Sequence, residues 1–330
     1  MFDLISVGDS ALDAFLTLDE KEASVKCKVK KEDCEICFNY GSKIPVEALD
    51  FSLGGNAPNV SVGLKRLGFN VGLYTIHGDD IVGRIADEKI EAEGLSREFI
   101  FKQPGQTSYS TIINYQTERT ILAKKQHRDY KIFDNFPKAP YMYISSLGPD
   151  FKDFYKDISK FVADHKVKLG FNPAPAELRG DFSYYEGVVR AANFVFVNKE
   201  EAGQMLGKQQ LIIDNGELIK EMLAKIAQFG PRYVVITVGV EGAYVFDSDK
   251  FYYCGIFPVK RVEATGAGDA FASGFMGAIM DGKNTIEAMR WGMVNSAAVV
   301  TKVGAIAGLL SKEQIENMLQ SKPDFGPKEI

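Results

Sequence analysis

The stretch RVEATGAGDAFASGF occupies residues 261–275, and it places three small residues directly before a carboxylate and an apolar helical pattern. If a helix begins near Gly268, its first amides are unpaired, and the helix dipole adds about half a positive charge at that end. Gly266, Ala267 and Gly268 allow a ligand's oxygen atoms to reach those amides without meeting a side chain. The stretch therefore predicts a helix N-terminus that binds an anion.

Asp269 lies in the first turn of this predicted helix, where its negative charge excludes it as a ligand of the same anion. A carboxylate there can instead accept the proton of an attacking hydroxyl, while the amides of Gly266–Asp269 stabilise a phosphoryl group in transfer. The alternative is a capped helix that packs closely on a strand and performs no chemistry. These residues alone leave both interpretations open.

The rest of the chain alternates short apolar runs with helical patterns. Val60, Leu64 and Leu67 share one face of a predicted helix over 54–69, and a second helix is expected over 81–93. Strands are expected at 2–7, 71–76, 141–146, 167–171, 194–198 and 233–238. Buried strands separated by helices are typical of a parallel sheet covered on both faces. The predicted fold class is α/β, a three-layer α/β/α core with a mostly parallel central sheet.

Two segments depart from this alternation. Residues 14–53 are charged and interrupt the first strand–helix unit, while 107–125 alternate in the manner of a β-hairpin with one exposed face. We expect 14–53 and 103–127 to form a small β-sheet lid, with 1–13, 54–102 and 128–330 as the core that binds nucleotide and substrate. The lid is also a candidate contact between subunits, and a homodimer through it is expected.

Composition and missing motifs exclude several functions. The 330 residues carry a formal net charge of −5, which argues against a nucleic-acid surface. No apolar run is long enough for a membrane helix, and MFDLISVGDS does not resemble a secretory signal, so a cytoplasmic location is expected. The chain has no Walker phosphate loop, no G-x-S-x-G elbow and no H-E-x-x-H pair.

Three of the four cysteines, Cys27, Cys34 and Cys37, lie in one lysine-rich stretch. The C-x-x-C pair at Cys34 and Cys37 is compatible with a small metal site, which would make the stretch a metal-binding interaction module, but a fourth ligand is not apparent. The alternatives are reduced thiols in a surface insertion and a redox-labile pair.

Several ordered motifs together resemble the ribokinase-like (PfkB) carbohydrate kinases over nearly the whole chain outside 14–53. These motifs are VGDSALDAF, GGNAPNVSVGLKRLG, GFNPAP, NKEE, ITVGVEGAYVF and EATGAGDAFASGF. The resemblance implies a kinase that uses ATP and Mg²⁺, with Asp269 as catalytic base and Gly266–Asp269 as anion hole. It also implies a sugar or nucleoside substrate.

The same resemblance suggests roles for further residues. Substrate ligands are expected at Asp13, Gly54, Gly55 and Asn59. Nucleotide contacts are expected at Asn198, Thr237, Gly239, Gly242 and Asn295, although a solvent-facing role for Asn295 is equally open. Glu201 is expected near Mg²⁺, directly or through water.

Two positions in the sequence concern the dependence on a monovalent cation and the charge of the substrate. Glu263 stands where the family usually has an aspartate that helps to bind a monovalent cation, so cation dependence is left open. Asn56 follows Gly55, whereas relatives that act on phosphorylated sugars often carry a lysine nearby, which favours a neutral substrate. A ribokinase- or fructokinase-like sugar kinase is the first interpretation. A nucleoside kinase is the alternative, and a non-catalytic binding regulator is third.

Overall fold

The computed structural model describes residues 1–330 except 20, 28–33, 117 and 208–215. The strands are β1 (Leu4–Val7), β2 (Ala11–Thr17), β3 (Ser24–Cys27), β4 (Cys34–Cys37), β5 (Ala48–Gly54), β6 (Val71–Gly78), β7 (Ile100–Gln103), β8 (Ser108–Tyr115), β9 (Glu118–Lys124), β10 (Tyr141–Ser145), β11 (Lys168–Asn172), β12 (Ala192–Asn198), β13 (Tyr233–Thr237), β14 (Ala243–Asp247), β15 (Lys250–Cys254) and β16 (Lys328–Glu329). The α-helices are α1 (Asn56–Arg66), α2 (Ile81–Ala92), α3 (Phe151–His165), α4 (Pro175–Leu178), α5 (Glu186–Ala191), α6 (Lys199–Met205), α7 (Gly216–Ala227), α8 (Ala267–Met280), α9 (Thr285–Val299) and α10 (Lys312–Gln320).

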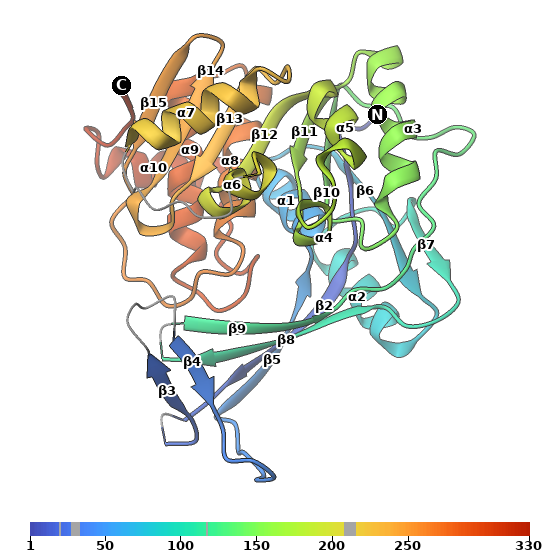
Figure 1. The fold of residues 1–330 in the computed structure, drawn as a ribbon, viewed down its shortest axis with the longest axis vertical. Helices are drawn as coiled ribbons and strands as arrows, with labels where there is room; N and C mark the ends of the chain where they lie inside the picture. The colour runs from blue at the N-terminus through green and yellow to red at the C-terminus, as the bar shows by residue number, and fades with distance from the viewer. Residues whose placement is uncertain (20, 28–33, 117, 208–215) are drawn as a thin grey trace.

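Ten strands form one large sheet in the order β16-β15-β14-β13-β12-β11-β10-β1-β6-β7. The pairs from β7 to β13 are parallel, and the last three strands at the other edge pair antiparallel. The predicted strands and the helices over 54–69 and 81–93 are all present. Helices lie on both sides of the sheet (Figure 1), which confirms the three-layer α/β/α prediction.

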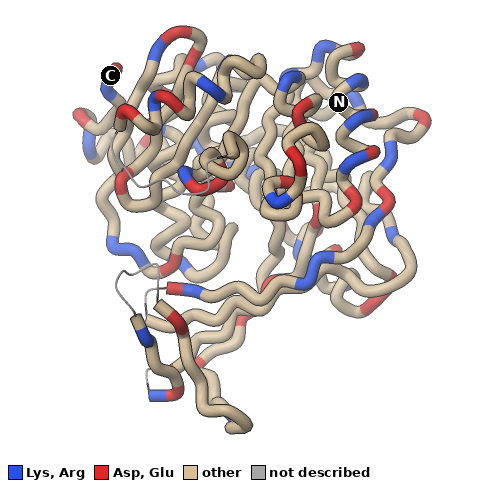
Figure 2. Tube along the Cα trace, in the orientation of Figure 1, with Lys and Arg blue, Asp and Glu red and all other residues tan. Residues whose placement is uncertain are grey.

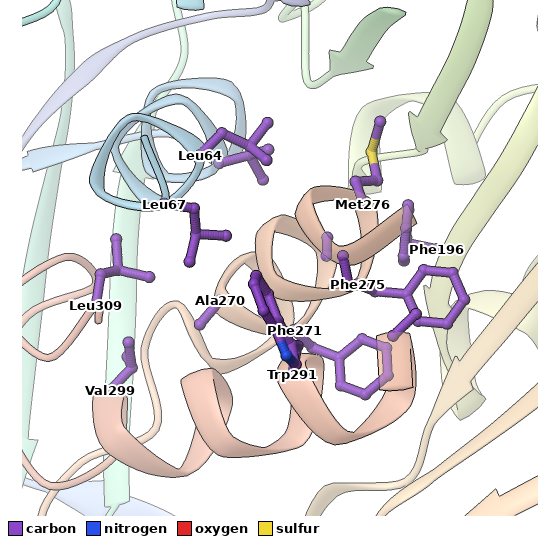
Figure 3. Close-up of a cluster of buried hydrophobic side chains, with 14 of the residues drawn as sticks. Leu64, Leu67, Phe196, Ala270, Phe271, Phe275, Met276, Trp291, Val299 and Leu309 are labelled. Carbon is purple, nitrogen blue, oxygen red and sulfur yellow. The ribbon is translucent and has the colours of Figure 1, made fainter. Parts of the chain in front are cut away.

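Each face of the sheet has its own hydrophobic core, because successive strand residues point to opposite faces. In β1, Leu4 joins the core under α1, α8 and α9, whereas Ile5 joins the core under α3, α5 and α7. Figure 3 shows the first core, where Phe271 and Phe275 of α8 pack beside Trp291 of α9. Helix α8 is therefore fixed by apolar packing along its length, which holds its N-terminus in place.

A second sheet of four strands, in the order β5-β2-β8-β9, projects from the core (Figure 1). Its β8 and β9 form an antiparallel hairpin, as predicted for 107–125. The register places Asp13 opposite Ser110 on one face of the sheet and Phe51 in line with Leu122 on the other. We call this four-stranded sheet the lid; its division from the core as a separate domain stays a prediction.

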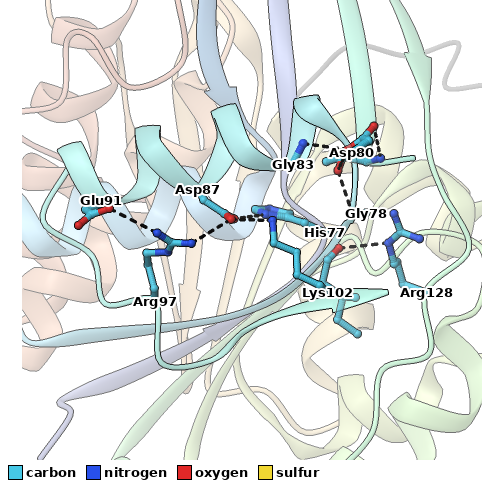
Figure 4. A network of polar contacts seen from close by, with 11 residues as sticks. His77, Gly78, Asp80, Gly83, Asp87, Glu91, Arg97, Lys102 and Arg128 are labelled. Atoms are coloured by element: carbon cyan, nitrogen blue, oxygen red, sulfur yellow. Dashed lines mark hydrogen bonds and ion pairs between the residues drawn. The ribbon is translucent and has the colours of Figure 1, made fainter. Parts of the chain in front are cut away.

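Helix α2 supports the lid from behind, because it packs against β2 and β5. Figure 4 shows the polar network that fixes this helix to the large sheet. Asp87 lies 2.6 Å from His77 Nδ1 and 2.6 Å from Lys102 Nζ, and Arg97 reaches it at 3.2 Å. Burial opposes ionisation of Asp87, but the hydrogen bonds from Lys102 and His77 outweigh it and lower the pKa of this carboxyl. These contacts connect α2, which packs against the lid, to β6 and β7 of the large sheet.

The cysteine-rich stretch forms the small hairpin β3–β4, and a Cys27–Cys34 disulfide joins its two strands. The loop 28–33 within it lies outside the described residues. A sulfur in a disulfide is not available as a thiolate ligand. Of the alternatives that the sequence left open, neither a metal site at Cys34 and Cys37 nor reduced thiols at Cys27 and Cys34 fits this hairpin. No cluster of metal-ligating side chains is present among the described residues.

Acidic and basic residues are mixed along the core and the lid, as Figure 2 shows. Within the described ranges, every helix is too short or too polar to cross a membrane.

Candidate active site

The carboxyl ends of three neighbouring parallel strands meet at one cavity. Asn172 ends β11, Asn198 ends β12 and Thr237 ends β13, and all three line a cavity of about 270 Å³. Open α/β sheets bind ligands at this edge, because the loops that follow the strands diverge there. The other side of the cavity is formed by the N-terminus of α8 and by one lid residue, Arg119.

The N-terminus of α8 has the open geometry expected from its sequence. Gly266 is the N-cap, with φ +79°, and a Cβ there would lie 2.6 Å from the Cα of Ala305. Only glycine fits this conformation and approach. No side chain caps the helix, and the described residues provide no acceptor for the N–H groups of Gly268 and Asp269, whereas Ala267 N–H bonds to Ala264 O at 3.3 Å. Two of the predicted amides are thus available to a ligand.

Asp269 projects from the first turn of α8 into the same cavity. Asn59 Nδ2 donates a hydrogen bond to its Oδ2 at 2.8 Å. Burial raises the pKa of Asp269 to about 7; the bond from Asn59 opposes the rise, and the charges of Glu201 and Asp13 add to it. A carboxyl that titrates near neutral pH in a cavity is suited to accept a proton.

Asn198 and Glu201 begin helix α6 as a reciprocal cap. Asn198 Oδ1 accepts from Glu201 N–H, and Glu201 Oε2 accepts from Asn198 N–H, both at 2.8 Å. This is a capping box, so the two side chains have a structural role as well as a place in the cavity lining. Burial raises the pKa of Glu201 to about 7, while the bond from Asn198 opposes the rise.

The four predicted substrate ligands lie at the junction of the lid and α1. The Asp13 carboxylate lies against Gly54, where a Cβ would be 2.3 Å from it. Gly55 has φ +105°, and a Cβ there would lie 2.4 Å from Asp9 O. Asn59 reaches back to Asp269. Burial raises the pKa of Asp13, and a hydrogen bond from Ser110 opposes the rise.

One predicted nucleotide contact is wrong. Asn295 is fully buried, and its Nδ2 donates to Ala270 O and Ser273 Oγ while its Oδ1 accepts from Leu310 N–H. These bonds use its polar atoms to join α9, α8 and the loop before α10, so it faces neither nucleotide nor solvent.

Gly239 and Gly242 lie in the turn after β13, outside the residues that line the cavity. A Cβ on Gly242 would lie 2.1 Å from Cys254 O, so close packing on β15 accounts for this glycine. Their predicted contact with nucleotide stays a prediction.

Asn56, Asn172 and Arg119 are among the residues that line the cavity but were not predicted as site residues. Asn56 Nδ2 donates to Asn172 Oδ1 at 2.7 Å, which ties α1 to β11. The sequence places Asn172 at the end of a predicted strand, and a polar residue at that position indicates a ligand site in an open α/β sheet. The sequence did not indicate that Arg119 lines the cavity, because a charged residue in a hairpin usually faces solvent.

Glu263 is buried below the anion-hole turn. Its Oε1 accepts from the N–H and hydroxyl of Thr265, and its Oε2 accepts from Gly304 N–H at 3.2 Å. The carboxylate thereby joins the chain before α8 to the loop that carries Ala305.

Known carbohydrate kinases resemble this chain in sequence. The model of the pfkB family carbohydrate kinases matches residues 17–312. A 5-dehydro-2-deoxygluconokinase of Clostridium tetani is 26% identical over 294 residues, which cover 82% of this chain and 85% of that protein.

Solved structures share the fold. The Arabidopsis thaliana ribokinase complexed with ribose and ATP has a TM-score of 0.74 and 16% identity, covering 97% of this chain and 99% of that one. The Burkholderia thailandensis nucleoside kinase in complex with inosine has a TM-score of 0.73 and 17% identity, with the same coverage. The family match spans most of the sequence, and the chain therefore belongs to the pfkB family of carbohydrate kinases, phosphotransferases that act on an alcohol group.

Proposed function

We propose that this chain transfers the terminal phosphoryl group of ATP to a hydroxyl of a neutral sugar of the ribose or fructose type. One observation carries the proposal: the Asp269 carboxyl and the uncapped amides of Gly268 and Asp269 line a single cavity at the carboxyl edge of the sheet. A base and an anion site at one point are what phosphoryl transfer to an alcohol requires.

In the proposed reaction, the Asp269 carboxylate accepts the proton of the attacking hydroxyl. Asn59 holds this carboxylate through its hydrogen bond. Asp13 accepts hydrogen bonds from the sugar hydroxyls, and Gly54 and Gly55 allow the sugar to approach the backbone. The amides at the start of α8 stabilise the charge that accumulates on the phosphoryl oxygens.

Glu201 fits a role near Mg²⁺. It is a carboxyl whose burial raises its pKa. Its Oε2 accepts from Asn198 N–H, and no described residue donates a hydrogen bond to its Oε1. A divalent cation would favour its ionised form. When bound, Mg²⁺ would neutralise phosphate charge and orient the terminal phosphate.

The alternative substrate is a nucleoside. The fold shared with the nucleoside kinase that binds inosine supports it, as does the opening GDSALD. Measuring ADP release from ATP and Mg²⁺ with a panel of sugars and nucleosides tests the proposal. Release with a neutral sugar supports it, and release with nucleosides alone favours the alternative. No release with any acceptor, together with measurable sugar binding, favours a non-catalytic regulator.

The pH dependence follows from the raised pKa of Asp269. Because only the ionised carboxylate accepts a proton, kcat/KM should fall about tenfold per pH unit below about pH 7 and be level above it. Glu201 and Asp13 face this group, and both keep its pKa high. Steady-state rates between about pH 5.5 and 8.5 test this. A flat profile through pH 6 would contradict the assignment of Asp269 as the base.

The outer face of the lid supports the proposed homodimer. Leu49, Phe51 and Leu122 are 52%, 47% and 58% exposed there. An exposed apolar sheet face is typical of a subunit contact. Light scattering should show a dimer for the wild type and a monomer for Phe51→Asp. Val240→Asp, at a residue that is 68% exposed and outside the lid, should leave the mass unchanged. A monomeric wild type would refute the dimer.

The cytoplasmic location expected from the sequence stays a prediction.

A further inference from the structure

The start of β9 faces the chain that leads into the anion hole. Arg119 Nε lies 3.7 Å from Glu263 Oε1, and Glu118 lies 3.5 Å from Arg261. The two ion pairs have opposite polarity. In the first, the lid supplies the cation Arg119, and in the second it supplies the anion Glu118. Figure 2 shows both signs of charge on the start of β9 and on the facing loop. Two ion pairs therefore join the start of β9 to the chain that precedes the anion hole.

At least one hydrogen-bond donor of the Arg119 guanidinium is unpaired among the described residues. At 3.7 Å its contact with Glu263 is an ion pair and not a hydrogen bond, and the Glu263 oxygens already accept from Thr265 and Gly304. Arg119 Nε is buried and has no hydrogen-bond partner among the described residues. A buried donor without an acceptor is costly unless a ligand supplies one.

The position of Arg119 identifies that ligand. It shares the cleft-facing side of the lid with Asp13, and it lines the same cavity as Gly266, Gly268 and Asp269. Among the described residues that line this cavity, Arg119 is the one cation, whereas Glu201 and Asp269 are acidic. A terminal phosphate that enters there needs more positive charge than a helix end supplies.

We propose that Arg119 is a catalytic residue that binds the terminal phosphate of the nucleotide from the lid, opposite the amides at the start of α8. The proposal rests on the proposed function, since it assumes that this cavity receives the phosphate. Glu263 holds the guanidinium at the edge of the cavity, and its weak contact allows the phosphate to take the donors.

Binding can be tested without turnover. Calorimetry would compare the affinities for ADP and for the non-hydrolysable ATP analogue AMP-PNP, both with Mg²⁺, in the wild type, Arg119→Gln and the control Glu118→Gln. We expect Arg119→Gln to weaken AMP-PNP at least about tenfold, with ADP affinity kept, because only AMP-PNP carries the terminal phosphate. The control removes the neighbouring ion pair and should leave both affinities unchanged.

Equal losses for both nucleotides, or no loss for either, would overturn the proposal. So would a Glu118→Gln protein that behaves like Arg119→Gln, because a simple lid contact would then explain both variants. If the tenfold loss appears but no acceptor supports ADP release by the wild type, the role of Arg119 stands while the proposed sugar kinase activity fails.

Turnover gives a second measurement. Arg119→Ala should lower kcat about 10²- to 10³-fold with the sugar KM nearly unchanged, and added guanidinium chloride at low millimolar concentration should restore part of the rate. A purely structural role would give no such rescue. A loss confined to the sugar KM would overturn the proposal, since Arg119 would then bind the acceptor.

Discussion

Replacing Asp269 by asparagine is expected to lower kcat by about 10³-fold, because an amide cannot accept the proton of the attacking hydroxyl. The fold should survive, since an asparagine carbonyl can still accept the hydrogen bond from Asn59 Nδ2. Affinity for AMP-PNP should also be nearly kept, because the free amides of Gly268 and Asp269 belong to the backbone. Steady-state rates and calorimetry on one preparation provide both measurements.

Asp281→Asn is the matched control for this experiment. Asp281 lies at the other end of α8, where its partly exposed carboxylate pairs with Lys312 at 2.8 Å. A surface ion pair of this kind contributes about 0–1 kcal/mol, so activity should be unchanged. If Asp269→Asn keeps more than about a tenth of the wild-type kcat, the carboxylate is not the base.

The sequence predicted the core well, because its signals are local there. Buried strands such as 233–238 are short apolar runs, and the start of α8 is marked by Gly266 and Gly268. The same apolar runs also predict where β12 and β13 end, at the polar residues Asn198 and Thr237. A parallel sheet gathers such ends at one edge, so their convergence on one cavity was predictable in outline.

Predictions failed where a residue's role depends on partners distant in the chain. Asn295 is held by Ala270 and Leu310, and nothing in its own helix indicates that these groups surround it. The Cys27–Cys34 pairing depends on the register of a hairpin. Arg119 reaches the cavity because the lid folds over the sheet, and no local motif encodes this position.

Replacing Gly266 by alanine is expected to displace the anion hole and lower kcat. Its Cβ would lie 2.6 Å from the Cα and Cβ of Ala305, so either the turn or the start of α8 must move. A shift of about 1 Å in a catalytic group can lower a rate about 10²-fold, and we expect kcat to fall by that factor.

Gly282→Ala separates this displacement from simple backbone strain. Gly282 follows α8 and has the same φ of +79°, but an added Cβ there meets nothing within 4 Å. Both variants therefore bear the left-handed penalty of about 1 kcal/mol, and only Gly266→Ala has the clash, which should cost about 2 kcal/mol more in urea unfolding. Gly282→Ala should keep full kcat. If the two variants lose equal stability and activity, the contact with Ala305 does not position the anion hole, and the amides at the start of α8 tolerate displacement.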